Sequence, residues 1–247
     1  MTLLATNIYW FFILLPLVSL LYASVGHGGA SGYLALMAFF SFSTEVMKPT
    51  ALLLNLFVAG IAFFHYYKQG HFHKKLFLSF ALTSIPLAYL GGRILIDASL
   101  YKKILGVLLL FAVLKMLDVF GKENQHSKDV NIWQGLIIGG LIGFFSGLIG
   151  IGGGIILSPV ILLLHWGNMK QAAAVSALFI WVNSVAGLIG QISIGVTFSS
   201  QSFLMVALAL LGGFFGAYLG SKHFSNKIVK QLLAFVLVMA SIKLIWV

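Results

Sequence analysis

Long stretches without a formal charge dominate the chain. Residues 8–25 contain no charged side chain, and residues 49–67 contain only His65. The segments 131–169 and 171–221 are 39 and 51 residues long and have no Asp, Glu, Lys or Arg. Apolar runs of about 18 residues or more are typical of helices that cross a bilayer. The pattern therefore predicts an all-α polytopic membrane protein.

Ten helices are predicted from this pattern, and two of them are too short to cross about 30 Å of hydrocarbon. The short ones are 33–43 and 155–166, and each follows a glycine-rich motif. Each motif therefore either breaks one long helix or separates a helix from a re-entrant half-helix. The predicted helices are 7–24, 33–43, 49–67, 76–96, 101–120, 132–149, 155–166, 171–193, 202–222 and 227–246.

Composition supports the membrane assignment. Hydrophobic residues make up 60% of the chain and charged residues 8%, against about 25% charged in soluble domains. The net charge of +10 comes from 15 Lys and Arg in short links between apolar segments, so a nucleic-acid partner is not expected. The absence of cysteine excludes disulfides and cysteine-ligated metals. The first lysine is Lys48, which argues against a signal peptide and for a retained first helix in the cell inner membrane.

An internal repeat is predicted on either side of a polar linker. The linker 121–131 divides the chain into a first membrane repeat, 1–120, and a second, 132–247. Four features recur in the same order at offsets of 124, 128, 129 and 128 residues: the glycine motif, Asn55 with Asn183, "AYLGG" with "AYLGS", and the last helix of each half. Duplicated halves with interrupted helices at matching positions point to a secondary transporter. Lysine placement leaves the membrane orientation open.

The two glycine motifs are predicted to form a site for a small anion. "SVGHGGASGY" begins at Ser24 and "LIGIGGGIIL" at Leu148. Irregular backbone at membrane depth persists only inside protein or beside a polar cavity. A break also frees N–H groups at the positive end of the following half-helix, where anions bind. These half-helices are expected to begin near residues 30–32 and 154–156, with their N-termini facing each other.

Close helix packing is the alternative role for these glycines. Gly-xxx-Gly patterns commonly mark contacts between membrane helices, and we assign this role to Gly135, Gly139 and Gly143. Packing alone does not account for a half-length helix after each of the two motifs.

The inventory of polar residues favours an anionic substrate. The five acidic residues lie at helix ends or in the linker, whereas cation transporters and proton relays usually need carboxylates within the membrane. Ser24, Ser176, Ser184 and Gln191 are further neutral polar residues near the motifs. The predicted substrate-binding residues are Gly26, His27, Gly28, Gly29, Ser31, Asn55, Gly150, Gly152, Gly153, Gly154, Ser158 and Asn183.

His27 has two possible roles. It could titrate and add positive charge for an anion, or it could be a neutral residue bonded to backbone. His65 and His165 are expected at the interface, and Lys243 is expected to extend towards it. The sequence contains no nucleophile–base–acid set, no paired carboxylates and no nucleotide loop, so we predict no enzymatic activity, no cofactor and no metal.

The glycine motifs also carry a resemblance to a known family. "GLIGIGGGIILSPVILLL" from Gly147, "SVGHGGASGYLALM" from Ser24, and "AYLGG" with "AYLGS" resemble the TauE/SafE family of sulfite and organosulfonate exporters, also called the toluene-sulfonate uptake permeases. The resemblance implies a polytopic inner-membrane permease for small sulfur-containing anions. The first motif departs from the GxGGG pattern at His27 and Ala30, and Ala35 stands where the second half has Pro159.

Together these features predict a secondary transporter for a small oxyanion, such as sulfite or an organosulfonate, bound between the two glycine breaks. The partners are the substrate and the lipid bilayer. An anion channel of the same architecture is one alternative, and an intramembrane enzyme or assembly scaffold is another. The exact substrate, direction, coupling ion and oligomeric state are left open.

Overall fold

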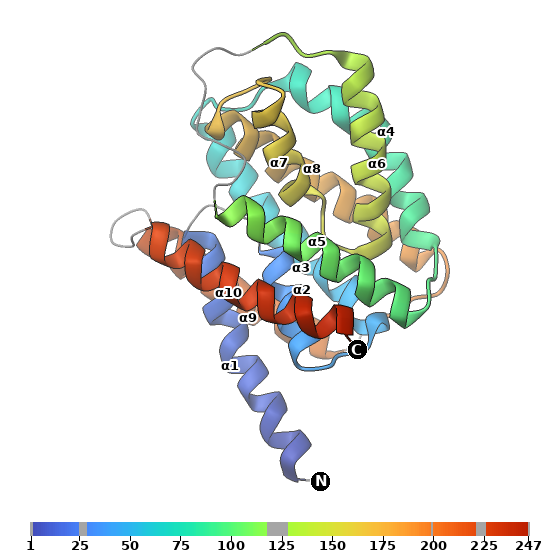
Figure 1. Cartoon of the computed structure of the whole chain (residues 1–247), viewed down its shortest axis with the longest axis vertical. Helices are drawn as coiled ribbons and strands as arrows, with labels where there is room; N and C mark the ends of the chain where they lie inside the picture. Colours follow the sequence, from blue (N-terminus) through green and yellow to red (C-terminus); the bar gives the residue numbers. More distant parts are fainter. Residues whose placement is uncertain (1, 25–28, 118–127, 199, 221–225, 247) are drawn as a thin grey trace.

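The chain folds into ten helices in the part that the computed structural model describes, residues 2–24, 29–117, 128–198, 200–220 and 226–246 (Figure 1). No strand occurs among these residues. The helices are α1 (Thr2–Ser24), α2 (Ala30–Phe39), α3 (Thr44–Lys68), α4 (Lys74–Arg93), α5 (Ala98–Met116), α6 (Ile132–Ile149), α7 (Gly154–Leu163), α8 (Met169–Ile192), α9 (Ser200–Gly220) and α10 (Asn226–Trp246).

Four helices within the described residues, α3, α4, α6 and α8, are long and apolar enough to cross a membrane. Shorter apolar helical segments lie in α1, α2, α7, α9 and α10. The two half-helices expected from the sequence are present, because α2 and α7 have 10 residues each. The protein is therefore an all-helical, multi-pass membrane protein.

The half-helix α7 returns towards the side of the molecule where α6 begins. The amide of Lys128, ahead of α6, donates to the carbonyl of His165, just past α7, at 2.6 Å. Figure 1 shows the same path: the chain descends through α6, turns, and climbs back through α7. Of the two arrangements left open by the sequence, the structure thus has a helix followed by a returning half-helix.

The half-helix α2 folds back along α1 in the same way. Ser19 Oγ lies 2.9 Å from the Tyr33 hydroxyl, and the Tyr22 hydroxyl lies 2.9 Å from Ser31 Oγ. The residue later in α1 is paired with the residue earlier in α2, so the two helices run antiparallel. Nine of the ten residues of α2 are buried, and only Phe39 at its end is exposed.

Glycines bring α6 directly onto α4. A Cβ on Gly139 would fall on the carbonyl of Phe80, and a Cβ on Gly143 on the carbonyl of Ser84. A Cβ on Gly135 would lie 2.8 Å from the side chain of Ser79 and 3.0 Å from its carbonyl oxygen. The contacts advance in step along both helices, so α4 and α6 run parallel. The packing role predicted for Gly135, Gly139 and Gly143 is confirmed, because only residues without a side chain let the backbones approach this closely.

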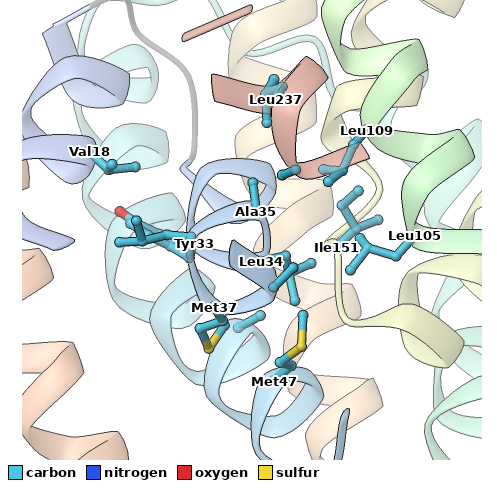
Figure 2. Packing of buried hydrophobic residues seen from close by; sticks show 14 of the residues in the cluster. Val18, Tyr33, Leu34, Ala35, Met37, Met47, Leu105, Leu109, Ile151 and Leu237 are labelled. Carbon is cyan, nitrogen blue, oxygen red and sulfur yellow. The ribbon is translucent and has the colours of Figure 1, made fainter. Parts of the chain in front are cut away.

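The buried centre of the molecule is formed by α2 and its neighbours. Figure 2 shows Leu34 and Ala35 of α2 among Leu105, Leu109 and Ile151. Helices α3 and α8 pack against each other, and so do α5 and α10. The packing of α2, of α3 on α8 and of α5 on α10 holds the segment between α6 and α7 inside the protein.

Several helices begin a few residues before their predicted starts, and α1 and α3 each begin five residues earlier. Helix α3 begins at Thr44, whereas the sequence pattern predicts a start at Pro49. Proline is common at the first helical position, because its missing N–H does no harm there. Instead Pro49 lies inside the helix and is buried. The earlier start makes Lys48 part of the helix.

Candidate functional site

The second glycine motif forms an irregular, buried segment between α6 and α7. Gly150, Gly152 and Gly153 have φ values of 86°, 80° and 75°, a region that only glycine adopts readily. All residues from Gly150 to Ile155 are buried. The Tyr101 hydroxyl of α5 donates to the carbonyl of Ile149 at 2.8 Å and fixes the end of α6. The sequence thus places non-helical backbone at membrane depth inside the protein, as required in lipid.

Asn55 on α3 lies directly against this segment. Its Nδ2 atom is 2.7 Å from the position that a Cβ would take on Gly152. The side chain is 1% exposed, and neither its Nδ2 nor its Oδ1 has a hydrogen-bond partner within the described structure. A buried amide without partners is costly, about 1–3 kcal/mol for each unsatisfied group. Such a group is a natural contact for a polar ligand.

The first turn of α7, which begins at Gly154, supplies further donors. The amides of Ile156 and Leu157 both bond to the carbonyl of Gly153. The amides of Gly154 and Ile155 belong to the first turn, where no carbonyl of the helix can accept from them. Ser158 Oγ donates to the carbonyl of Gly154 at 2.8 Å and lies 2.9 Å from Ser176 Oγ of α8. The predicted residue Ser158 is therefore already hydrogen-bonded.

Asn183 on α8 lies in a neighbouring polar cluster. Its Oδ1 accepts from Ser84 Oγ at 2.6 Å, while its Nδ2 is buried without a partner in the described chain. Ser146 Oγ of α6 is buried and lacks a partner there as well, and its Cβ lies 3.5 Å from the Cβ position of Gly153. Ser146 of α6 thus lies beside the start of α7, whereas Ser84 and Asn183 form a hydrogen bond between α4 and α8. Sequence reasoning missed Ser84 and Ser146, because only helix packing shows their neighbours.

The first glycine motif is described only in part. Gly26, His27 and Gly28 lie outside the described residues, so their predicted roles stay predictions. Gly29 is buried immediately before α2. Ser31 is buried and paired with the Tyr22 hydroxyl, so in this conformation its hydroxyl is engaged within the protein.

The described parts of the two motifs meet through apolar side chains. Ile151 of the second motif lies among Leu34, Ala35, Leu105 and Leu109 (Figure 2). Gly152 and Gly153 instead contact Asn55 of α3, Ile142 and Ser146 of α6, and Phe179 and Ile180 of α8, so that polar and apolar side chains both line this part of the motif. The structure therefore brings Asn55, Gly152, Gly153 and Gly154 together and leaves Ser31 in a separate hydrogen bond.

Lys48 is a further residue at this site, which sequence reasoning missed. It is 8% exposed, and a Cβ on Gly150 would lie 2.9 Å from its carbonyl oxygen. Its amine donates to the carbonyls of Gly91, Gly92 and Ile94 at 3.3, 3.0 and 3.2 Å. The one available signal was its position seven residues before Asn55, which places both on one face of a helix.

Comparison with known proteins agrees with the fold and the motifs. The family described as sulfite exporter TauE/SafE matches residues 11–244. A probable membrane transporter protein of Sinorhizobium fredii, y4hK, is 36% identical over 93% of this chain and 94% of its own length. YunE of Bacillus subtilis, also a probable membrane transporter protein, is 24% identical over 95% of this chain and 97% of its own length. No solved structure matches the chain.

The family match covers both glycine motifs and all but the two ends of the chain. The relatives are named as probable membrane transporters, and the described chain has several helices of membrane length. The match thus agrees with a multi-pass protein of the inner membrane that acts on a small substrate. The chain belongs to the TauE/SafE sulfite exporter family and is a membrane transporter.

Proposed function

We propose that the protein is a secondary transporter for a small sulfur-containing oxyanion, either sulfite or an organosulfonate. The substrate binds at the second glycine motif, between the side chain of Asn55 and the first turn of α7. In this proposal Gly152 and Gly153 let neighbouring side chains, Asn55 among them, approach the backbone, and the amides of Gly154 and Ile155 donate to the oxyanion. No covalent step and no cofactor are required.

The observation that carries the proposal is the buried, unpartnered amide of Asn55 beside Gly152. A helix N-terminus alone binds anions only weakly, because its charge is about half an elementary charge. An asparagine amide adds two N–H donors at a fixed position. Both polar atoms of the Asn55 side chain lack a protein partner within the described chain, so a ligand can bond to the side chain without first breaking a hydrogen bond.

The positions of the charges support an anion rather than a cation. Glu45, Asp97 and Asp129 are exposed and lie at or near helix starts. In the described helices no carboxylate is buried. A site for Na⁺ or a proton relay usually contains such a group. Donors without a nearby carboxylate match the needs of an oxyanion.

We also propose that the two halves form inverted or parallel repeats around this site. In support, Gly140 faces Thr83, and Pro16 faces Gly212. Gly140 follows Pro16 by 124 residues, and Gly212 follows Thr83 by 129 residues. These are the offsets of the glycine motif and of the "AYLG" motif in the sequence, so the two contacts correspond to each other. The antiparallel pairs α1–α2 and α6–α7 correspond in the same manner. Alternating access then follows from movement of one half against the other.

Uptake into proteoliposomes tests the function. We expect purified protein to accumulate labelled sulfite or methanesulfonate, and we expect no uptake of glycine or of Rb⁺, since the site has donors for an oxyanion and no carboxylate. Empty liposomes give the background. Uptake of the cation or the amino acid, with no uptake of either sulfur anion, would contradict the proposal.

A counterflow measurement separates a transporter from an anion channel. In proteoliposomes preloaded with unlabelled substrate, a transporter exchanges internal for external substrate and transiently accumulates label above the external concentration. A channel equilibrates the label without this overshoot. We expect the overshoot, because matching halves with interrupted helices are typical of secondary transporters. Large single-channel currents without counterflow would instead show that the protein is an anion channel.

A further inference from the structure

Lys48 is a buried cation without a counter-ion in the described chain. The hydrogen-bond partners of its amine are three backbone carbonyls at the end of α4. No carboxylate among the described residues forms an ion pair with it, and Glu45, one turn earlier on the same helix, is exposed. Carbonyl dipoles at a helix C-terminus stabilise a positive charge, but they do not neutralise it. The site therefore keeps a net positive charge inside the protein.

Lys48 and Asn55 lie on one face of α3. Seven residues correspond to just under two helical turns, so both side chains leave the helix in nearly the same direction, about 10 Å apart along the axis. Both contact the second glycine motif: the backbone of Lys48 lies against Gly150, and the amide of Asn55 lies against Gly152. The irregular segment thus runs along α3 from the charged residue to the unpartnered amide.

The amine has a structural role, because it caps three carbonyls at the end of α4. Taking an ion out of water into a protein is strongly unfavourable unless it is fully paired, and neutral carbonyls do not neutralise the charge. A methionine could fill the same volume between α3 and the end of α4, but it would leave these carbonyls without the donor. A positive charge beside the path of an anionic substrate also attracts that substrate.

We propose that Lys48 is the fixed positive charge of the substrate path, and that it pairs with the anion on its way to or from Asn55. This inference rests on the proposed transport of an oxyanion. In the described conformation the carbonyls of α4 hold the amine in the absence of substrate. An arriving oxyanion then replaces one or more of these bonds to neutral carbonyls, at 3.0–3.3 Å, with a bond in which both partners are charged. The residue therefore sets the affinity for anions and selects against neutral and cationic solutes.

Two substitutions test this role in proteoliposomes with labelled sulfite and methanesulfonate. Lys48→Met removes the charge at similar volume, and Lys48→Arg keeps it. We expect Lys48→Met to raise KM at least about tenfold, the loss that corresponds to one charge-assisted hydrogen bond. Lys48→Arg should restore most of the affinity, because the charge is what the anion requires.

Lys243→Met is the control for the loss of a helix-capping lysine at a less buried position. Lys243 also donates to a carbonyl at a helix C-terminus, that of Phe39 at the end of α2, at 2.6 Å, and to Ser41 Oγ at 2.9 Å. It lies on α10 and has no contact with the second glycine motif among the contacts described for that motif. The same loss of charge and of a helix cap should leave KM unchanged there.

A labelling experiment on the unmodified protein covers the case in which Lys48→Met does not fold. Acetylation by a small N-hydroxysuccinimide ester is followed at each lysine by mass spectrometry, with and without methanesulfonate. The anion should slow acetylation of Lys48 several-fold and leave the exposed Lys103 unaffected. Equal rates at Lys48 with and without an anion that the protein transports would overturn the proposal.

The outcomes separate this inference from the proposed function. If the unmodified protein transports the sulfur anions and Lys48→Met keeps the same KM, the role of Lys48 is wrong and the transport function stands. If the maximal rate of Lys48→Met falls only in proportion to the amount of folded protein, and KM is unchanged, the role of Lys48 is likewise wrong. If the unmodified protein transports neither anion, the proposed function fails, and the inference falls with it.

Discussion

At the scale of single residues, the proposed site depends on Gly152 and Asn55. Gly152 combines a positive φ of 80° with a neighbour, Asn55 Nδ2, at 2.7 Å from its Cβ position. The first property requires glycine for the backbone, and the second requires it for space. A ligand at Asn55 would need the same space, so the residue that shapes the turn also shapes the site.

A matched pair of substitutions separates these two properties. Gly152→Ala and Gly195→Ala both place alanine at a positive φ, 80° and 84°, but nothing lies within 4 Å of the Cβ position of Gly195. Each should lose about 1–2 kcal/mol of stability from the backbone. Only Gly152→Ala should reduce sulfite uptake, by about tenfold or more, because its methyl group displaces the amide of Asn55. Equal uptake by both variants, normalised to folded protein, would remove Gly152 from the site.

The sequence predicted some residues of the site and missed others for a physical reason. Gly152, Gly153 and Gly154 were predicted because the glycine cluster precedes a half-length helix, and Asn55 because it matches Asn183 in the second half. Lys48 was overlooked because lysines near helix ends usually reach water, and its burial depends on where the end of α4 lies. The roles assigned to Gly26, His27 and Gly28 remain predictions.

At the scale of helices, the contact between α4 and α6 is made by glycines with different tolerances. A Cβ on Gly139 would fall on the backbone carbonyl of Phe80, which cannot move independently of its helix. A Cβ on Gly140 would meet Cδ1 of Leu87 at 2.9 Å, the far end of a flexible side chain. Neighbouring glycines on one buried helix therefore differ in what surrounds them.

This difference predicts opposite effects of the same substitution. Gly139→Ala should destabilise the protein by about 1–3 kcal/mol, because the helices must separate. Gly140→Ala should be neutral or stabilising by up to about 1 kcal/mol, because alanine favours the helix and Leu87 can rotate away. Thermal unfolding of the purified variants in one detergent measures both. A ranking with Gly140→Ala as the less stable variant would contradict this packing of α4 on α6.

Helices were easier to predict than their arrangement. The length and composition of the apolar runs determined where the half-helices lie, since ten residues cannot cross the hydrocarbon. The return of α7 towards the start of α6 depends on the positive φ angles at Gly150, Gly152 and Gly153 and on contacts with α8. Neither follows from hydropathy. The start of α3 was misplaced because Pro49 is tolerated inside the helix once it is packed.

At the scale of the whole molecule, the proposed mechanism requires the halves to move against each other. Helix α3 of the first half and α9 of the second are joined by a hydrogen bond between Thr50 Oγ1 and Ser202 Oγ at 3.0 Å. Both side chains are buried. A permanent link at this point should hold the two halves in the described conformation.

A disulfide between two introduced cysteines can provide this link. The chain has no native cysteine, so no other disulfide can form within it. The variant with Thr50→Cys and Ser202→Cys should form a disulfide on mild oxidation, lose counterflow of sulfite or methanesulfonate, and recover it on reduction. Each single variant, treated with the same oxidant, should transport normally. Full counterflow with the disulfide formed would show that this contact between the halves does not open during transport.

The central claim, that a small sulfur oxyanion binds beside Asn55, is tested most directly by equilibrium binding. Calorimetric titration of purified protein with sulfite and with methanesulfonate compares Asn55→Asp with Asn131→Asp. Asn131 is exposed and caps α6 by accepting from the amide of Gln134, which aspartate can also do. At position 55 the same change places a negative charge against the anion. We predict unchanged affinity in Asn131→Asp and affinity at least about tenfold weaker in Asn55→Asp. Unchanged affinity in a folded Asn55→Asp variant would contradict the claim.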